Sequence, residues 1–181
     1  MPKPRPPFEP GRFYHIYNRG AHRVSIFREH SNYLFVLSKM KRYLAQLHLT
    51  VIVYCLMPNH YHYLLRQDGK QRAGLLPQRV FNSYSKAYNK RYGHSGTLFE
   101  DNYRIIPVEE EAYLLHLCRY IHANPVKDGL VDRLEDWAYS NYHEWVGLRN
   151  GTMVDRDFIK SYFPSADAYI EFVWSYLRGN Y

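Results

Sequence analysis

The strongest constraint on the fold lies in residues 49–66. Residues 49–57 (LTVIVYCLM) are apolar and rich in β-branched side chains, a composition typical of a buried strand. Pro58-Asn59 makes a short turn, and a second strand-like segment occupies residues 60–66. Two strands joined by so short a connection are expected to pair as an antiparallel hairpin.

Periodicity along the rest of the chain predicts further strands and helices. The expected elements are a strand over residues 12–18, a helix over 29–47, the hairpin strands over 49–57 and 60–66, a helix over 75–92, a strand over 103–108 and a helix over 109–123. We expect Ser31 to cap the first helix, Gly93 to close the second and Pro125 to follow the end of the third. This order predicts an α+β fold, a mainly antiparallel sheet covered by helices, and a ferredoxin-like arrangement is its natural form.

The C-terminal part of the chain has shorter helical patterns. They are expected around residues 139–146, 155–162 and 166–177. With 181 residues, the chain is long enough for one domain with a sizeable core. We therefore expect one domain over residues 1–145 and a C-terminal helical extension, residues 146–181, packed on it. The proline-rich residues 1–7 suggest an extended arm.

Three features favour a cytoplasmic protein. No stretch of about 18 uncharged apolar residues is present, so no segment is expected to span a membrane. The first residues lack the apolar core of a signal peptide. Cys55 and Cys118 stand alone, without Cys-x-x-Cys spacing, which indicates two structural thiols in a reducing compartment.

Positive charge is concentrated toward the N-terminus. Residues 1–60 contain nine Lys and Arg against two Asp and Glu, residues 61–124 contain nine against six, and residues 125–181 contain six against nine. This imbalance suggests that one side of the molecule binds a polyanion. The alternative is a merely basic protein that has no such partner.

Tyrosine favours a nucleic acid as that polyanion. The chain has 19 Tyr, and many stand beside Arg, Lys or Asn, as in Tyr17-Asn18-Arg19 and Asn102-Tyr103-Arg104. Aromatic rings that stack on unpaired bases, interleaved with cations for phosphates, are how proteins grip single strands. Most of these rings are expected to be half-buried with an exposed hydroxyl, so the pattern does not identify individual binding residues.

The second hairpin strand contains a candidate metal site. Successive side chains on a strand point to opposite faces, so His60 and His62 project from the same face, and Tyr61 and Tyr63 from the other. The two imidazoles can converge on one divalent cation, which can polarise a phosphoryl oxygen. The alternative is a pair of surface histidines, since the chain has 10 His.

The helix that begins near residue 109 supplies possible partners for this metal. His116, Tyr120 and Asn124 are four residues apart and share a helix face. If that face meets the histidine strand, a phenol and an amide oxygen arrive beside the imidazoles. Hard cations such as Mg²⁺ or Mn²⁺ prefer oxygen ligands and keep open positions. The alternative for Tyr120 is that it is one more structural tyrosine.

Two separated motifs resemble a known family. PNHYHYLL, around His60 and His62, and RYIHANPV, residues 119–126, resemble the small single-tyrosine transposases of the HUH endonuclease superfamily. The second motif particularly resembles their REP-associated branch, bacterial proteins linked to repetitive extragenic palindromes. YHIYNRG at residues 14–20 and the W-x-x-S-x-Y pattern at residues 137–142 also fit, so the resemblance covers about residues 10–145.

The resemblance implies a role for each matching position. His60 and His62 would bind the divalent metal, Mg²⁺ or Mn²⁺, with Asn124 as the third ligand, and Tyr120 would be the nucleophile. Insertion-sequence relatives typically have Gln at the position of Asn124, a departure that favours the REP-associated branch. This departure leaves open whether the protein is mobile and whether it is a monomer or a homodimer. The implied partner is single-stranded DNA with hairpin structure, inside a bacterial cytoplasm.

The implied chemistry is an exchange of bonds at phosphorus. A phenol of pKa about 10 is a poor nucleophile at neutral pH, and a metal on the scissile phosphate would stabilise the developing charge. Tyr120 would attack to leave a 5′-phosphotyrosine and a free 3′-hydroxyl, so rejoining needs no nucleotide energy. The absence of a phosphate-binding Gly-x-x-x-x-Gly-Lys-Ser/Thr loop agrees with this. His116 is a candidate proton carrier or a plain core or surface histidine, whereas His122, about 200° around the helix from Tyr120, is expected to support structure.

Six basic residues are the expected contacts to DNA phosphates or bases. They are Arg19, Arg23, Lys86, Lys90, Arg91 and Arg104. Two rival functions remain open at this point. One is a domesticated protein that binds hairpin DNA or RNA without cutting it. The other is a zinc hydrolase, although two histidines and an amide make a poor zinc set beside His₃ or His₂Glu.

Overall fold

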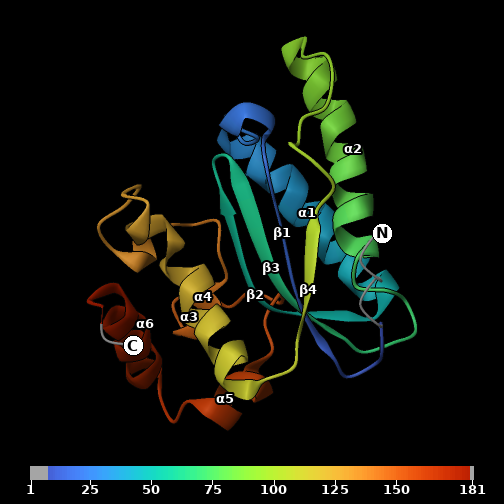
Figure 1. The fold of residues 1–181 in the computed structure, drawn as a ribbon. Helices are drawn as coiled ribbons and strands as arrows, with labels where there is room; N and C mark the ends of the chain where they lie inside the picture. The colour runs from blue at the N-terminus through green and yellow to red at the C-terminus, as the bar shows by residue number, and fades with distance from the viewer. Residues whose placement is uncertain (1–7, 180–181) are drawn as a thin grey trace.

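The computed structural model of the protein describes residues 8–179 (Figure 1). The arm predicted over residues 1–7 lies outside them. The strands are β1 (Phe13–Arg19), β2 (Leu49–Met57), β3 (His60–Gln67) and β4 (Arg104–Val108). The helices are α1 (His30–Leu47), α2 (Leu75–Tyr92), α3 (Glu111–Lys127), α4 (Tyr142–Trp145), α5 (Arg156–Tyr162) and α6 (Ala166–Leu177), with 3₁₀ turns at Ala21–Arg23 and Leu134–Asp136.

The sheet has four strands in the order β2-β3-β1-β4, and every neighbouring pair is antiparallel. The predicted hairpin is present as β2 and β3, with Met57 opposite His60 across its turn. β1 lies between β3 and β4, so that Tyr17 is opposite both His62 and Arg104. The predicted ferredoxin-like α+β fold is confirmed.

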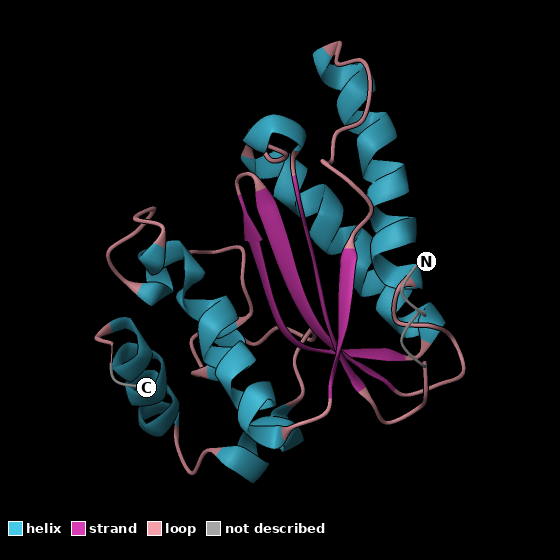
Figure 2. Cartoon of the chain, viewed as in Figure 1, coloured by secondary structure: helices cyan, strands magenta, loops and turns pink. Residues whose placement is uncertain are grey.

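Helices cover the two faces of the sheet as separate layers. Figures 1 and 2 show α1 and α2 on one side and α3 to α6 on the other. Tyr61 and Tyr63 of β3 are buried in the core on the α1 and α2 side. Leu64 of β3 belongs instead to the core formed with α3 and α6. The alternation predicted for the histidine strand is therefore confirmed, and its histidines face α3.

Two predicted helix ends differ from the structure. Glu29, rather than Ser31, is the N-cap of α1, because its carboxylate and the Asn32 side chain form a reciprocal capping box. α3 does not stop before Pro125 but continues to Lys127. Proline removes only its own N–H donor, and hydrogen bonding resumes beyond it, with the Asp128 amide 2.9 Å from the Asn124 carbonyl oxygen.

The helix predicted over residues 139–146 is reduced to the single turn of α4. The residues before it run along the outer edge of β2, where the Leu56 amide donates to the Tyr139 carbonyl and the Asn141 amide donates to the Tyr54 carbonyl. These bonds cover a strand edge that would otherwise be open. The final helix α6 packs on α3. Among residues 8–179, no helix combines the length and the hydropathy needed to cross a bilayer.

Candidate active site

His60 and His62 lie at the start of β3, on the face of the sheet that α3 covers. Their ring centroids are 5.2 Å apart and the rings are nearly perpendicular. His62 is buried, whereas His60 is partly exposed. The two imidazoles are therefore neighbours at one end of the sheet, as the spacing of the motif predicts.

A hydrogen bond to Nδ1 orients each imidazole. The Nδ1 atom of His62 is 3.0 Å from the Nε2 atom of His15, and the Nδ1 atom of His60 is 2.7 Å from the Oδ1 atom of Asn59. Within the described residues no hydrogen bond engages either Nε2 atom. This is the usual arrangement of a metal-binding histidine, in which a neighbour holds one nitrogen and the other binds the ion.

Burial favours the neutral form of both histidines. Desolvation lowers the pKa of His60, and it holds the pKa of His62 well below the usual range, with smaller contributions from His15 and His60. A neutral imidazole has the free electron pair that a metal needs. Both rings therefore favour the neutral form, the form that a metal ligand needs.

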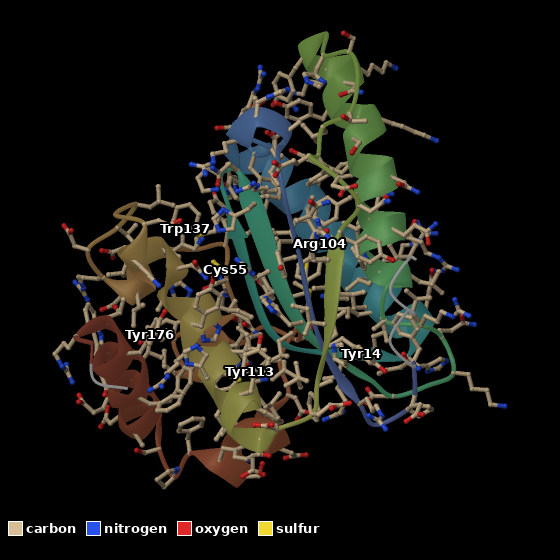
Figure 3. The ribbon with its side chains drawn as sticks, in the orientation of Figure 1. Tyr14, Cys55, Arg104, Tyr113, Trp137 and Tyr176 are labelled. Carbon is tan, nitrogen blue, oxygen red and sulfur yellow. The ribbon has the colours of Figure 1, made fainter. Side chains whose placement is uncertain are left out.

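Tyr120 of α3 meets this histidine pair. Its ring lies edge-on to His62, with centroids 5.6 Å apart and an interplanar angle of 81°. His116, one turn earlier on α3, stacks near Tyr120 at 6.1 Å. The ring centroids of Tyr176 and Tyr120 are 6.5 Å apart. Figure 3 shows Tyr176 where α6 meets α3. The tertiary structure thus brings the predicted helix face onto the histidine strand.

The surroundings of Tyr120 keep its phenol protonated. Burial raises its pKa, and Lys127 opposes this effect. The Lys127 Nζ atom lies 5.6 Å from the centre of the Tyr120 ring and donates a hydrogen bond to the Tyr176 hydroxyl at 2.9 Å. A neutral phenol is a weak nucleophile, so any attack by Tyr120 requires help in removing its proton.

Asn124 is buried one turn after Tyr120. Its side-chain Nδ2 atom donates to the Tyr120 carbonyl oxygen at 3.0 Å, which leaves Oδ1 as the atom available to a ligand. Within residues 8–179 no group of three or more His, Cys, Asp and Glu side chains is arranged to hold a metal ion. The three ligands predicted from the sequence would supply two neutral imidazoles and one amide oxygen, a set that fits a hard divalent cation with open positions.

His122 lies away from this site, in the core. Its Nδ1 atom is 2.6 Å from the Tyr169 hydroxyl, and its Nε2 atom is 2.9 Å from Oδ1 of Asn141. Asn141 also donates to the carbonyl oxygen of Ile52 in β2. This network joins α3, β2 and α6, which is the supporting role expected for His122.

The predicted DNA contacts lie in three separate places. Arg19 and Arg104 line a cavity that also includes His60, and Arg19 is held there by an ion pair with Glu100. Lys86, Lys90 and Arg91 are exposed on α2. This helix covers the other face of the sheet (Figure 1). Arg23 is exposed in the turn after β1. The structure therefore brings only Arg19 and Arg104 next to the histidines.

Two residues of the site were not singled out from the sequence. His15 is buried and contacts His62, and the Tyr17 ring lies 5.6 Å from the His62 ring. The alternation of β1 does place both on one face of their strand. Their proximity to His62 depends on the register between β1 and β3, which alternation within one strand does not reveal.

Comparisons with known proteins give a family match and similar solved structures. A family model described as "Transposase IS200 like" matches residues 12–124. A solved structure of a REP-associated tyrosine transposase bound to a REP hairpin is similar, with a TM-score of 0.68 and 15% identity, over 86% of this chain and 98% of that chain. A second, from Deinococcus radiodurans and described as a candidate transposase, has a TM-score of 0.45 and 16% identity, over 67% of this chain and 95% of that chain. The search of curated proteins finds no match.

Proposed function

This chain belongs to the IS200-like transposase family, whose model matches more than half of its residues, and from that premise we propose a specific activity. We propose that it is a metal-dependent single-stranded DNA endonuclease and strand transferase. It would cleave near DNA hairpins through a 5′-phosphotyrosine intermediate and rejoin the strands.

The observation that carries this proposal is the edge-on contact between Tyr120 and His62. A phenol that attacks a phosphate held beside the histidine pair must itself lie next to that pair, because catalysis depends on such positioning. Here a helix and a strand from distant parts of the chain place the two side chains together. A tyrosine with a purely structural role would not need to lie beside a pair of histidines whose Nε2 atoms make no hydrogen bond.

His60, His62 and Asn124 are the residues that would hold the metal. A bound Mg²⁺ or Mn²⁺ would polarise the scissile phosphate and offset its negative charge. The Tyr120 oxygen then forms a bond to phosphorus, the bond from phosphorus to the 3′-oxygen breaks, and the 3′-oxygen leaves with a proton as a hydroxyl. Rejoining is the reverse reaction, in which a 3′-hydroxyl attacks the phosphotyrosine.

The phenolic proton needs an acceptor. His116 lies on the same face of α3 as Tyr120, and its ring is stacked near the phenol. Partial burial lowers the pKa of His116, with help from Arg119 and Lys127, so its imidazole is neutral at pH 7 and can accept a proton. We therefore assign the proton-carrier role to His116.

Hairpin DNA is the proposed partner. The similar solved structure is of a REP-associated tyrosine transposase bound to a REP hairpin. The basic N-terminal part of this chain has the charge that such a ligand requires. Tyr120 meets His62 within one chain, so this geometry is available to a monomer as well as to a homodimer.

A covalent adduct is the decisive test. The protein is incubated with Mn²⁺ and a labelled single-stranded hairpin, and the products are separated in detergent. We expect a protein–DNA adduct whose nucleotide maps to Tyr120, and not to its ring neighbour Tyr176, to the nearby Tyr17 or to the surface residue Tyr113. Tyr120→Phe should bind the hairpin normally and form no adduct.

Other outcomes would replace the mechanism. An adduct that persists in Tyr120→Phe would assign the nucleophile to a different residue. Cleavage without any adduct would indicate a metal-activated water. Tight hairpin binding with neither cleavage nor adduct would favour a domesticated hairpin-binding protein.

A further inference from the structure

A cavity of about 400 Å³ adjoins the candidate metal ligand His60. It lies where β4 begins, between the last residues of β1 and the loop that precedes Arg104. Its lining residues are Tyr17, Asn18, Arg19, His60, Glu100, Asp101, Asn102 and Arg104. A cavity of this volume is at the small end of ligand pockets, with room for one nucleotide.

Tyr17 provides the aromatic wall of this cavity. It is half-buried on β1, directly opposite His62, and its ring centroid lies 5.0 Å from that of His15. Contacts with the rings of His15 and His62 hold the Tyr17 ring in place. Within residues 8–179 the Tyr17 hydroxyl makes no hydrogen bond, so the sheet does not require this residue to be a tyrosine.

Charged and polar residues from β1 and the loop before β4 also line the cavity. Arg19 and Glu100 form an ion pair, and the Glu100 amide donates to the Arg19 carbonyl at 3.0 Å, which fixes the loop before β4 against β1. Asn18 also holds this loop, since its Nδ2 atom donates to the Asp101 carbonyl at 2.9 Å. Hydrogen bonds and an ion pair thus join the end of β1 to the loop before β4 on this side of the cavity.

Arg104 is the cation of this cavity that is best placed for a phosphate. It is opposite Tyr17 on β4, its side chain is two-thirds exposed, and its ion pair with Asp101 is long at 3.7 Å. Figure 3 shows it at the start of β4. An exposed guanidinium with only a loose partner can turn toward a phosphate and bind it with two parallel hydrogen bonds.

We infer that this cavity is a subsite for one unpaired nucleotide adjacent to the scissile phosphate, with the Tyr17 ring as the stacking surface for its base and Arg104 as the contact for its phosphate. The inference rests on the proposed function and names a part of its substrate. Since His60 lines the same cavity, a nucleotide bound here would place its neighbouring phosphate beside the candidate metal site. Stacking on a ring tolerates any base, so this subsite would require a base without selecting its identity.

Binding of hairpins with a single-stranded tail tests the subsite. The measurements use full-length protein carrying Tyr120→Phe, without metal, so that no cleavage occurs. The probes are a blunt hairpin, a hairpin with an intact tail, and tailed hairpins with one abasic nucleotide at each tail position in turn. We expect one tail position at which loss of the base weakens binding by at least about fivefold, the lower limit for base stacking.

Further substitutions in the same protein identify which residue causes the loss of binding at the abasic position. Tyr17→Leu should abolish the abasic penalty at that position, whereas Tyr17→Phe, which keeps the ring, should retain it. Tyr162→Leu, a half-buried tyrosine of α5, is the matched control and should also retain it. Arg104→Gln changes only an exposed side chain and should weaken binding of the tailed hairpin but not of the blunt one.

Two results would overturn the subsite. One is an abasic penalty of the same size in Tyr17→Leu and Tyr17→Phe, and the other is the absence of a penalty at every tail position. If Arg104→Gln and the parent protein bind the tailed hairpin equally well, Arg104 is not part of the subsite. Because these measurements need neither metal nor nucleophile, a Tyr17-dependent penalty without any Tyr120 adduct would sustain the subsite and reject the cleavage mechanism.

Discussion

The Nε2 atom of His15 lies 3.0 Å from the Nδ1 atom of His62, so a histidine of β1 holds a candidate metal ligand of β3 in a defined orientation. Burial lowers the pKa of His15 to about 4, so this partner is neutral at pH 7. The contact fixes which nitrogen of His62 remains available for a cation. It also links β1, an inner strand of the sheet, to the proposed chemistry.

Removing this partner should weaken metal binding. We expect His15→Leu to lower Mn²⁺ affinity by about 10- to 100-fold, the usual effect of losing such a supporting contact. His15→Gln, which can still form a hydrogen bond, should recover part of that loss. Isothermal titration with Mn²⁺ measures both variants, and equal affinity in His15→Leu and the wild type would show that His62 needs no orientation by β1.

Removing a candidate metal ligand should impair cleavage more than removing His15, which only orients one of these ligands. His60→Ala or His62→Ala should abolish Mn²⁺-dependent cleavage and leave hairpin binding within a few-fold of the wild type. Asn124→Ala should impair metal use less, because a neutral amide oxygen is the weakest of the three ligands. Cleavage at the wild-type rate by either histidine variant would remove that residue from the metal site.

The basic surface of α2 should contribute to DNA affinity through phosphates. Replacing Lys86, Lys90 and Arg91 by Ala should reduce affinity and flatten its salt dependence by about one unit for each lost phosphate contact. Arg91 is already paired with Glu29 at 2.8 Å, so its share should be smaller than that of the two lysines. Binding measured over a range of salt concentrations checks this, and an unchanged slope would place the DNA elsewhere.

His122 should make stability depend on pH. Burial lowers its pKa from 6.5 to about 3. Between these values the unfolded chain binds a proton that the folded protein does not, so the free energy of unfolding falls as the pH is lowered. The loss is about 1.4 kcal/mol per pH unit within that window.

A variant isolates this contribution. His122→Gln should cost about 1–3 kcal/mol at pH 7, because it disturbs buried hydrogen bonds. At pH 5 the difference in free energy of unfolding between the variant and the wild type should be smaller by about 2 kcal/mol. The reason is that only the wild type has a histidine at this position, which takes up a proton on unfolding at pH 5. Denaturant unfolding at the two pH values gives the comparison, and an equal deficit at both would contradict the buried neutral form.

Local pattern accounts for much of this protein. The period of two along β3 put His60 and His62 on one face, and the period of α3 aligned Tyr120 with Asn124, because both depend on backbone geometry within one element. The hairpin of β2 and β3 was predictable for the same reason, since a two-residue turn leaves its strands little choice of partner. The end of α3 was not, because a proline predicts a break that a helix can tolerate in its last turn.

Relations between elements distant along the chain could not be predicted from the sequence, because they depend on tertiary packing. The contact of His15 with His62 depends on a strand register spanning 47 residues, and the ion pair of Arg19 with Glu100 joins positions 81 apart. The meeting of Tyr120 with His62 likewise depends on how α3 packs on the sheet. Periodicity states which face a side chain occupies, whereas packing of the whole core selects which faces meet.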